Sequence, residues 1–199
     1  SGGHTGIYLV NSHTECKCLG QTRDDAAGEA FDKVAKMLDL GYPGGNVISR
    51  LAESGDPDRY RFPRAYLDKK LFDFSFSGIK TAVKRHIETH KDYNQHLPDI
   101  AAGFEAAVVE VMANKLIMAS EEYKCTRIAL VGGVAANSAL RRKISGEAKA
   151  REFYFVGAEC VGKYEIASRV NVILCYLEDF IRLTQVPLFR RVAKGEAKL

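Results

Sequence analysis

Two glycine-rich segments have the composition of a site for an anion or a nucleotide. Residues 1–5 (Ser-Gly-Gly-His-Thr) lead into an apolar segment, and residues 131–137 (Val-Gly-Gly-Val-Ala-Ala-Asn) lie between an expected strand and an expected helix. Glycines lack a Cβ atom, so backbone N–H groups can approach a phosphate closely, and a helix N-terminus favours negative charge. Asn137 could hydrogen-bond a ribose or a base edge. Because ordinary turns and strand-to-helix connections have the same composition, both interpretations stay open.

A group of acidic residues stands at the start of an expected helix. Asp25, Glu29 and Asp32 follow an i, i+4, i+7 spacing, which would place them on one helical face. They could accept hydrogen bonds from ribose hydroxyls or hold a metal-bound ligand; alternatively, they cap the helix and form a solvated face. Gly28 within this helix costs about 1 kcal/mol relative to alanine, which favours close packing or the approach of a ligand.

The histidines and cysteines give weaker signals. His86 and His90 have the i, i+4 spacing with which one helical face can chelate a metal, but no third ligand is evident nearby, so a structural role is favoured. The Glu between them stands at the third position of the motif, whereas a zinc protease has it at the second. Cys16 and Cys18 lack a second cysteine pair, and no Ser-His-Asp or Cys-His set is apparent.

The elements that must position these residues follow from periodicity and turn signals. Strands are expected over residues 5–10, 15–19, 127–131 and 152–156, and an extended segment with both phenylalanines on one face over 73–78. Helices are expected over residues 26–40, 46–52, 79–90, 98–123, 135–149 and 164–183. Because strands and helices alternate in the second half of the chain, the sequence predicts an α/β fold.

Composition excludes several other classes of protein. The chain has 199 residues, of which 46% are hydrophobic and 27% are charged, and this balance excludes an intrinsically disordered chain. The sequence contains no uncharged apolar run of about 18 residues, so it predicts no transmembrane helix. Five scattered cysteines indicate a reducing compartment rather than a disulfide scaffold. Residues 182–199 hold five basic residues and one acidic residue, so the net charge of +4 describes a tail and not a basic domain.

Six sequence blocks, in their order along the chain, resemble one family, the bacterial tRNA N6-adenosine threonylcarbamoyltransferases (TsaD). The blocks are residues 1–5, 24–33, 42–45, 73–83, 99–102 and 132–138, and the resemblance runs from residue 1 to about residue 155. It implies an α/β lobe of the actin/Hsp70/sugar-kinase-like (ASKHA) fold, with a mixed sheet flanked by helices, incomplete relative to the two-lobed family fold. Residues 1–159 would form this C-terminal lobe, and residues 160–199 a divergent C-terminal helix and basic tail.

The resemblance also implies a reaction and a site. The family transfers a threonylcarbamoyl group from threonylcarbamoyl-AMP to N6 of the tRNA adenosine adjacent to the anticodon, and it uses one divalent metal, iron or zinc. The implied ligand is ATP or threonylcarbamoyl-AMP. The implied partners are tRNA and the subunits TsaB and TsaE, and no membrane is among them. The implied location is the cytoplasm. The nucleotide contacts of the family map onto Ser1, Gly2, Gly3, Asp32, Gly45 and Asn137.

The sequence departs from the family pattern in two places. The family has an N-terminal lobe with a His-x-x-x-His metal pair ahead of the Ser-Gly-Gly-His-Thr block, and this sequence does not include it. The family also has a Cys-Thr-Asp-Asn block, and in the corresponding residues 160–163 (Cys-Val-Gly-Lys) Gly162 replaces the Asp. We therefore expect an incomplete metal site and no activity of this chain alone, with its catalytic residues unassigned. The alternative is a non-catalytic module that binds tRNA or partner subunits through the basic tail and Arg59, Arg61, Arg64, Lys69 and Lys70.

Overall fold

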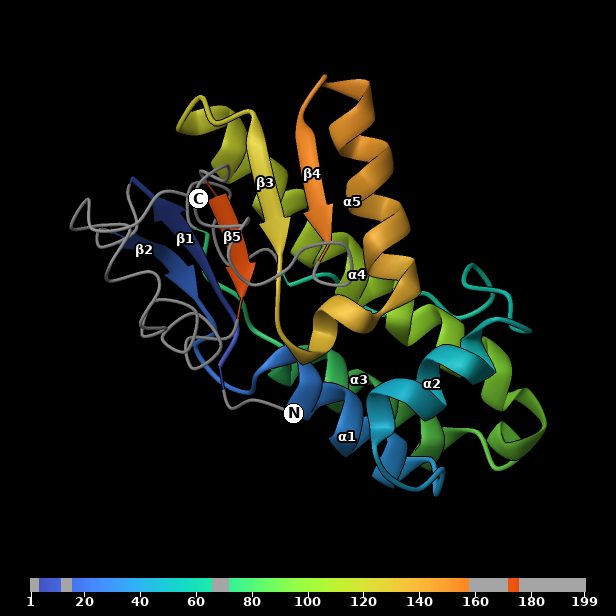
Figure 1. The fold of residues 1–199 in the computed structure, drawn as a ribbon. Coiled ribbons are helices and arrows are strands. Elements are labelled where there is room, and N and C mark those ends of the chain that lie inside the picture. Colours follow the sequence, from blue (N-terminus) through green and yellow to red (C-terminus); the bar gives the residue numbers. More distant parts are fainter. Residues whose placement is uncertain (1–3, 12–15, 66–71, 158–171, 176–199) are drawn as a thin grey trace.

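The computed structural model describes residues 4–11, 16–65, 72–157 and 172–175 (Figure 1). Their strands form a mixed sheet in the order β2-β1-β5-β3-β4. β1 runs antiparallel to β2 and β5, whereas β3 runs parallel to β4 and β5. The predicted α/β class is thereby confirmed. The strand bounds are β1 (Gly6–Val10), β2 (Cys16–Gln21), β3 (Arg127–Leu130), β4 (Tyr154–Gly157) and β5 (Val172–Cys175).

The central position of β5 corrects the expectation of a helix over residues 164–183, which is wrong at residues 172–175. Ile173 of β5 lies opposite Tyr8 of β1 on one side and Ala129 of β3 on the other. The Val-Ile-Leu-Cys segment is a short apolar run with two β-branched residues, which suits an interior strand of a sheet. Apolar spacing alone does not distinguish a buried strand from a buried helix. The rest of this predicted helix lies outside the described residues.

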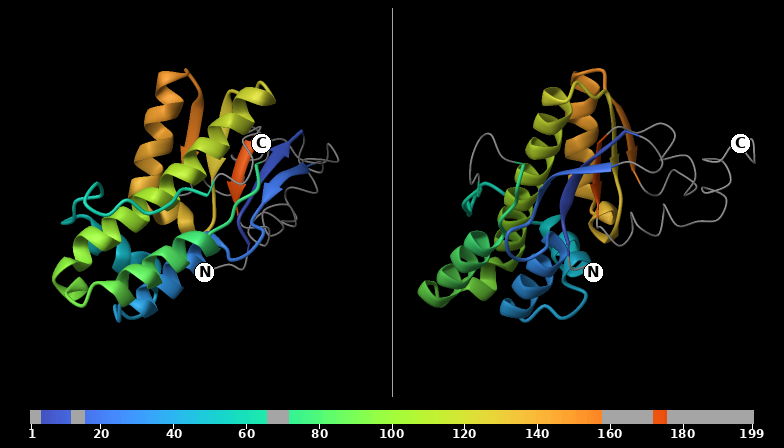
Figure 2. Two further views of the ribbon diagram at one scale, coloured as in Figure 1. Left: turned by 180° about the vertical axis from the view of Figure 1, so that it is seen from behind. Right: turned by 90° about the vertical axis from the view of Figure 1, so that its left-hand side faces the viewer.

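Helices α1 to α5 surround one end and one face of the sheet. Figure 2 shows that α4 runs along the sheet while α1, α2 and α3 gather beyond one end of it. The helices predicted within residues 26–149 are confirmed, with ends shifted by up to three residues. Helix α1 ends at Met37 instead of residue 40, and α5 begins at Ser138 instead of residue 135 because a 3-10 helix, Gly133–Ala136, precedes it. The bounds are α1 (Ala27–Met37), α2 (Gly44–Ala52), α3 (Ser77–Thr89), α4 (Leu97–Glu122) and α5 (Ser138–Ala150).

Helix α4 is the centre of the hydrophobic core. Its side chains are buried on nearly every side, and fully buried Phe104 packs edge-on against Phe31 of α1, with ring centroids 5.1 Å apart. Burial of one such ring stabilises the fold by about 1.5–3 kcal/mol. Because α4 also contacts α2 and α5, it fixes these helices relative to each other. Neither α4, with 26 residues, nor any other helix of the described part is apolar enough to cross a membrane.

The extended segment before α3 connects that helix to the sheet. Phe74 and Phe76 are both buried, and their rings stack with centroids 6.0 Å apart, so the predicted shared face is confirmed. The backbone N–H of Phe74 donates to the carbonyl oxygen of Gln21 at 3.0 Å, and the N–H of Arg23 donates to the carbonyl oxygen of Phe74 at 2.9 Å. The N-terminus of α3 is thereby held at the end of β2.

Candidate functional site

A cavity of about 550 Å³ lies where α1, α2 and the connection from β3 to α5 meet. Small-molecule sites typically have volumes of about 300–1,000 Å³. Three predicted nucleotide contacts, Asp32, Gly45 and Asn137, line this cavity although they are far apart in the sequence. The other three, residues 1–3, lie outside the described residues. The remaining lining residues are Gly28, Phe31, Pro43, Asn46, Ser49, Arg50, Glu53, Gly133, Val134, Ala136 and Ser138.

Three helices present their N-terminal turns to the cavity. Gly28 is the second residue of α1, Gly45 is the second of α2, and Ser138 is the first of α5. Each helix N-terminus carries a partial positive charge and N–H groups without partners within the helix, and both favour an anion. These helix N-termini favour an anionic ligand, which is one of the two interpretations that the composition of residues 131–137 left open.

Asp32 holds the start of α2 against α1. Its Oδ1 atom accepts a hydrogen bond from the backbone N–H of Gly44 at 2.8 Å, and its Oδ2 atom has no hydrogen-bond partner among the described residues. A Cβ atom on Gly44 would lie 2.6 Å from Asp32 Cα, whereas a Cβ atom on Gly45 would meet nothing within 4 Å. One oxygen of the Asp32 carboxylate thus has a structural role.

Asn137 is the N-cap residue of α5 and belongs to a partly buried polar network. Its Oδ1 atom accepts a hydrogen bond from the backbone N–H of Leu140 at 2.7 Å, the usual role of asparagine at this position. Its Nδ2 group donates to Oε1 of Glu105 at 2.7 Å and to Oγ of Ser49 at 3.0 Å. Sequence patterns do not single out Glu105 or Ser49, because the two partners are 56 residues apart and neither has a local motif.

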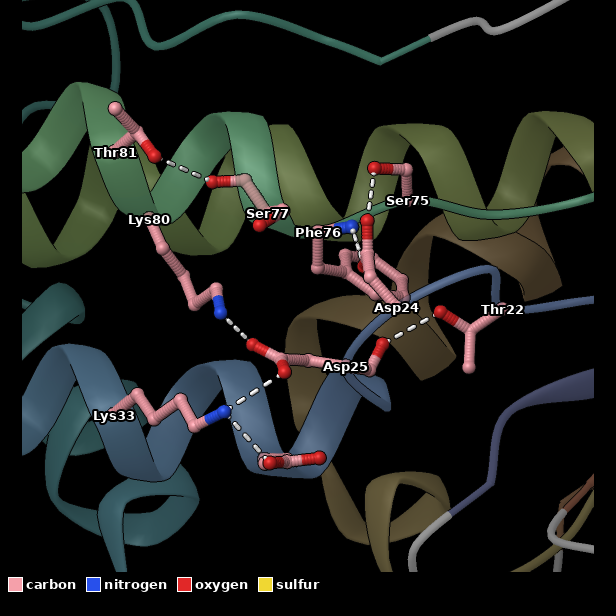
Figure 3. Close-up of polar contacts among 10 residues, drawn as sticks. Thr22, Asp24, Asp25, Lys33, Ser75, Phe76, Ser77, Lys80 and Thr81 are labelled. Carbon is pink, nitrogen blue, oxygen red and sulfur yellow. Dashed lines mark hydrogen bonds and ion pairs between the residues drawn. The ribbon is translucent and has the colours of Figure 1, made fainter.

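The acidic residues at the start of α1 do not all share one face, which corrects that expectation. Asp25 precedes the helix and forms ion pairs with Lys33 of α1, at 2.8 Å, and with Lys80 of α3 (Figure 3). Glu29 pairs with Lys33 at 2.7 Å, and this hydrogen bond lowers the pKa of the Glu29 carboxyl. Asp32 alone of the three lines the cavity. Asp25 and Glu29 are therefore partners of lysines rather than acceptors for a cavity ligand.

Asp24 links the entry of α1 to the segment before α3. Its carboxylate accepts hydrogen bonds from the backbone N–H of Phe76, at 2.8 Å, and from the hydroxyl of Ser75 (Figure 3). Helix α1 itself has Ala26 as its N-cap residue, with no side-chain capping hydrogen bond. The expected acidic capping of α1 is thus absent at its N-cap, and Asp24 instead stabilises the approach of α3 to α1.

His86 and His90 stack on each other rather than converge on a common point. Their ring centroids lie 4.2 Å apart, and the ring of Tyr60 lies 4.5 Å from that of His86. Within the described part of the chain, no group of three or more His, Cys, Asp or Glu side chains is arranged to hold a metal ion. These residues therefore do not fit the divalent metal of the resembled family. The segment around Gly162 lies outside the described residues.

The arginines between residues 59 and 64 are neutralised by carboxylates. Each has a partner within 3.0 Å, namely Asp99 for Arg59, Asp58 for Arg61 and Glu110 for Arg64. These carboxylates offset the positive charge of the arginines, so the segment is less basic than its arginines alone suggest and gives little support to a tRNA-binding surface. Lys69, Lys70 and the basic tail lie outside the described residues.

The fold and the site together define a class, that of α/β proteins with a small-molecule cavity at converging helix N-termini. Comparison with known proteins gives the family. The family model described as "TsaD: tRNA N6-adenosine threonylcarbamoyltransferase" matches residues 1–160, and the chain belongs to this family.

Curated relatives with the name tRNA N6-adenosine threonylcarbamoyltransferase match about three quarters of the chain. The protein of Desulforapulum autotrophicum is 56% identical over 149 residues, which cover 74% of this chain and 45% of that relative. The protein of Syntrophotalea carbinolica is 51% identical over 158 residues, covering 78% and 46%, and that of Thermotoga neapolitana is 48% identical over 149 residues, covering 75% and 45%. The chain thus spans slightly less than half the length of the curated relatives it matches.

Proposed function

We propose that this chain is a nucleotide-binding C-terminal lobe of ASKHA type. It would belong to an enzyme that transfers threonylcarbamoyl from threonylcarbamoyl-AMP to N6 of the tRNA adenosine adjacent to the anticodon. The observation that carries the proposal is that Asp32, Gly45 and Asn137, which the family resemblance assigns to the nucleotide, line one cavity. Family membership and the names of the relatives support the reaction. The proposed ligand is ATP or threonylcarbamoyl-AMP.

The cavity residues have distinct roles in this proposal. Oδ2 of Asp32 accepts a hydrogen bond from a ribose hydroxyl, because a carboxylate oxygen is an acceptor. The N-terminal turns of α2 and α5 face the phosphate, and Arg50 on the cavity wall adds a positive charge. Gly45 leaves the space in front of α2 open, so the ligand can approach the backbone.

The chain by itself is proposed to bind the nucleotide without completing the transfer. An enzyme with its site in a cleft needs both walls to orient the reacting groups, and this chain covers 45% of the relative from Desulforapulum autotrophicum. The described residues also do not form a metal site. We propose tRNA, TsaB and TsaE as partners of the complete enzyme, in the cytoplasm, with this lobe supplying the nucleotide side.

Replacing Asp32 by asparagine should weaken nucleotide binding without loosening the fold. Asparagine keeps an oxygen that accepts from the N–H of Gly44, but it presents an NH₂ group where Oδ2 would accept a ribose hydroxyl. A hydrogen bond to a charged group contributes about 1.5–3 kcal/mol, so ATP should bind roughly tenfold more weakly or worse. Isothermal titration calorimetry of the purified chain with ATP measures this change.

The matched control is Asp58→Asn, which removes an exposed carboxylate paired with Arg61 and outside the cavity. It should leave the affinity for ATP unchanged. Equal affinities of the wild-type and Asp32→Asn chains, at equal melting temperatures, would contradict the proposed site.

A further inference from the structure

Glu105 lies on α4 beside the cavity, and only 8% of its surface is exposed. Its Oε1 atom accepts two hydrogen bonds, from Ser49 Oγ at 2.6 Å and from Asn137 Nδ2 at 2.7 Å. A buried carboxylate is tolerated when its oxygens have donors, and both donors here are residues that line the cavity. Glu105 therefore joins α2, α4 and the start of α5 at one wall of the cavity.

This network determines which atoms of the Asn137 amide remain free. The carbonyl Oδ1 must face the N–H of Leu140, because an NH₂ group there would place two donors against each other. The Nδ2 group then donates towards Oε1 of Glu105 and Oγ of Ser49, two oxygens that lie 2.6 Å apart. An amide oxygen has two lone pairs, so one lone pair of Oδ1 is left. Asn137 can therefore offer a ligand an acceptor.

We propose that Glu105 is a positioning residue that makes the nucleotide site selective for a ligand with hydroxyl donors. It acts through Asn137, whose amide it holds with the carbonyl oxygen available. The inference rests on the proposed nucleotide-binding function. Together with Oδ2 of Asp32, Asn137 gives the cavity two acceptors, which match the two hydroxyls of a ribose. The site should therefore prefer a ribonucleotide over its 2′,3′-dideoxy analogue.

Because both hydrogen bonds end on Oε1 of Glu105, two variants of this residue can test the proposal. Glu105→Gln keeps an amide oxygen that can accept from both Ser49 and Asn137, whereas Glu105→Leu is similar in size and has no acceptor. The probes are ATP and 2′,3′-dideoxy-ATP, titrated into the full chain by calorimetry. The wild-type chain and Glu105→Gln should prefer ATP by about tenfold, and Glu105→Leu should lose most of this preference.

The comparison of two nucleotides separates positioning from a general loosening of the site. A merely structural role for Glu105 would weaken both nucleotides by the same factor and leave their ratio unchanged. The matched control is Glu110→Leu, on the same helix, which removes the partner of Arg64 at 3.0 Å and should leave the ratio at its wild-type value. If Glu105→Leu does not fold, Glu105→Asp replaces it, because its shorter side chain withdraws the oxygen while keeping the charge.

Amide hydrogen exchange gives a readout that does not depend on the ligand. The N–H of Leu140 should exchange faster in Glu105→Leu than in the wild-type chain and in Glu105→Gln, because Asn137 no longer holds it. An unchanged nucleotide ratio in Glu105→Leu, or a Glu105→Gln chain that behaves like Glu105→Leu, overturns the inference. If the wild-type chain binds neither nucleotide, the proposed function fails, and equal Leu140 exchange in all chains then overturns the positioning role as well.

Discussion

At the scale of single residues, three carboxylates of one short segment have different environments. Asp25 lies between Lys33 and Lys80, Glu29 pairs with Lys33, and Asp32 lines the cavity while holding Gly44. Residue type and spacing along the sequence do not distinguish the three carboxylates. Their roles differ because α1 begins at Ala27, which leaves Asp25 outside the helix and free to meet α3.

His86 should make the free energy of unfolding depend on pH. Burial lowers the pKa of its imidazole below the usual 6.5, and His90 and His96 lower it further, while Asp92 acts in the opposite direction. Its Nε2 atom is buried and has no hydrogen-bond partner in the described part of the chain. Because the unfolded chain binds this proton more readily, the stabilising contribution is full above pH 6.5 and is lost as the pH falls towards the lowered pKa.

Urea unfolding at about pH 7.5 and about pH 5.5 measures this dependence, and Glu and Asp side chains titrate mainly below that range. The wild-type chain should be less stable at the lower pH, and the difference should shrink in His86→Gln. A difference of the same size in the variant would show that other groups cause it.

At the scale of elements, the start of α2 depends on two adjacent glycines with opposite surroundings. Gly44→Ala would force a Cβ atom to 2.6 Å from both Asp32 Cα and the carbonyl oxygen of Phe31, and such overpacking destabilises by about 1–3 kcal/mol. Gly45→Ala meets no atom within 4 Å and should leave the fold as stable or slightly more stable, because alanine favours helix.

The two alanine variants therefore have opposite expected signatures. Urea denaturation should show a loss of stability for Gly44→Ala only. Titration with ATP should show weaker binding for Gly45→Ala despite its intact fold, because its methyl group enters the cavity. A stable Gly44→Ala chain would contradict the close contact between α1 and α2, and unchanged ATP binding by Gly45→Ala would argue against a ligand at this turn.

At the scale of the whole molecule, the chain matches slightly less than half of each relative described above. We expect the purified chain, incubated with threonylcarbamoyl-AMP and tRNA, to yield no threonylcarbamoyladenosine above the level found without protein, as measured by mass spectrometry of digested nucleosides. A family member that spans the full length of these relatives is the positive control. Robust modification by this chain alone would overturn the proposal that it supplies only the nucleotide side.

The sequence by itself determined the α/β class, the positions of the helices within residues 26–149, the shared face of Phe74 and Phe76, and the family. These features depend on residues close together in the sequence or on the order of motifs along it, so they can be predicted without knowing the tertiary contacts. It also indicated Asp32, Gly45 and Asn137 as contacts for a nucleotide, which stays a proposal.

Only the tertiary structure decided that these three residues line one cavity, that Glu105 and Ser49 hold Asn137, and that residues 172–175 form a strand between β1 and β3. The physical reason is the same in each case. Hydrophobic periodicity records which side of a segment is apolar, but the partner that covers that side, or that accepts a given hydrogen bond, can be any distance away along the chain. The packing of the other elements around α4 determines which partners meet.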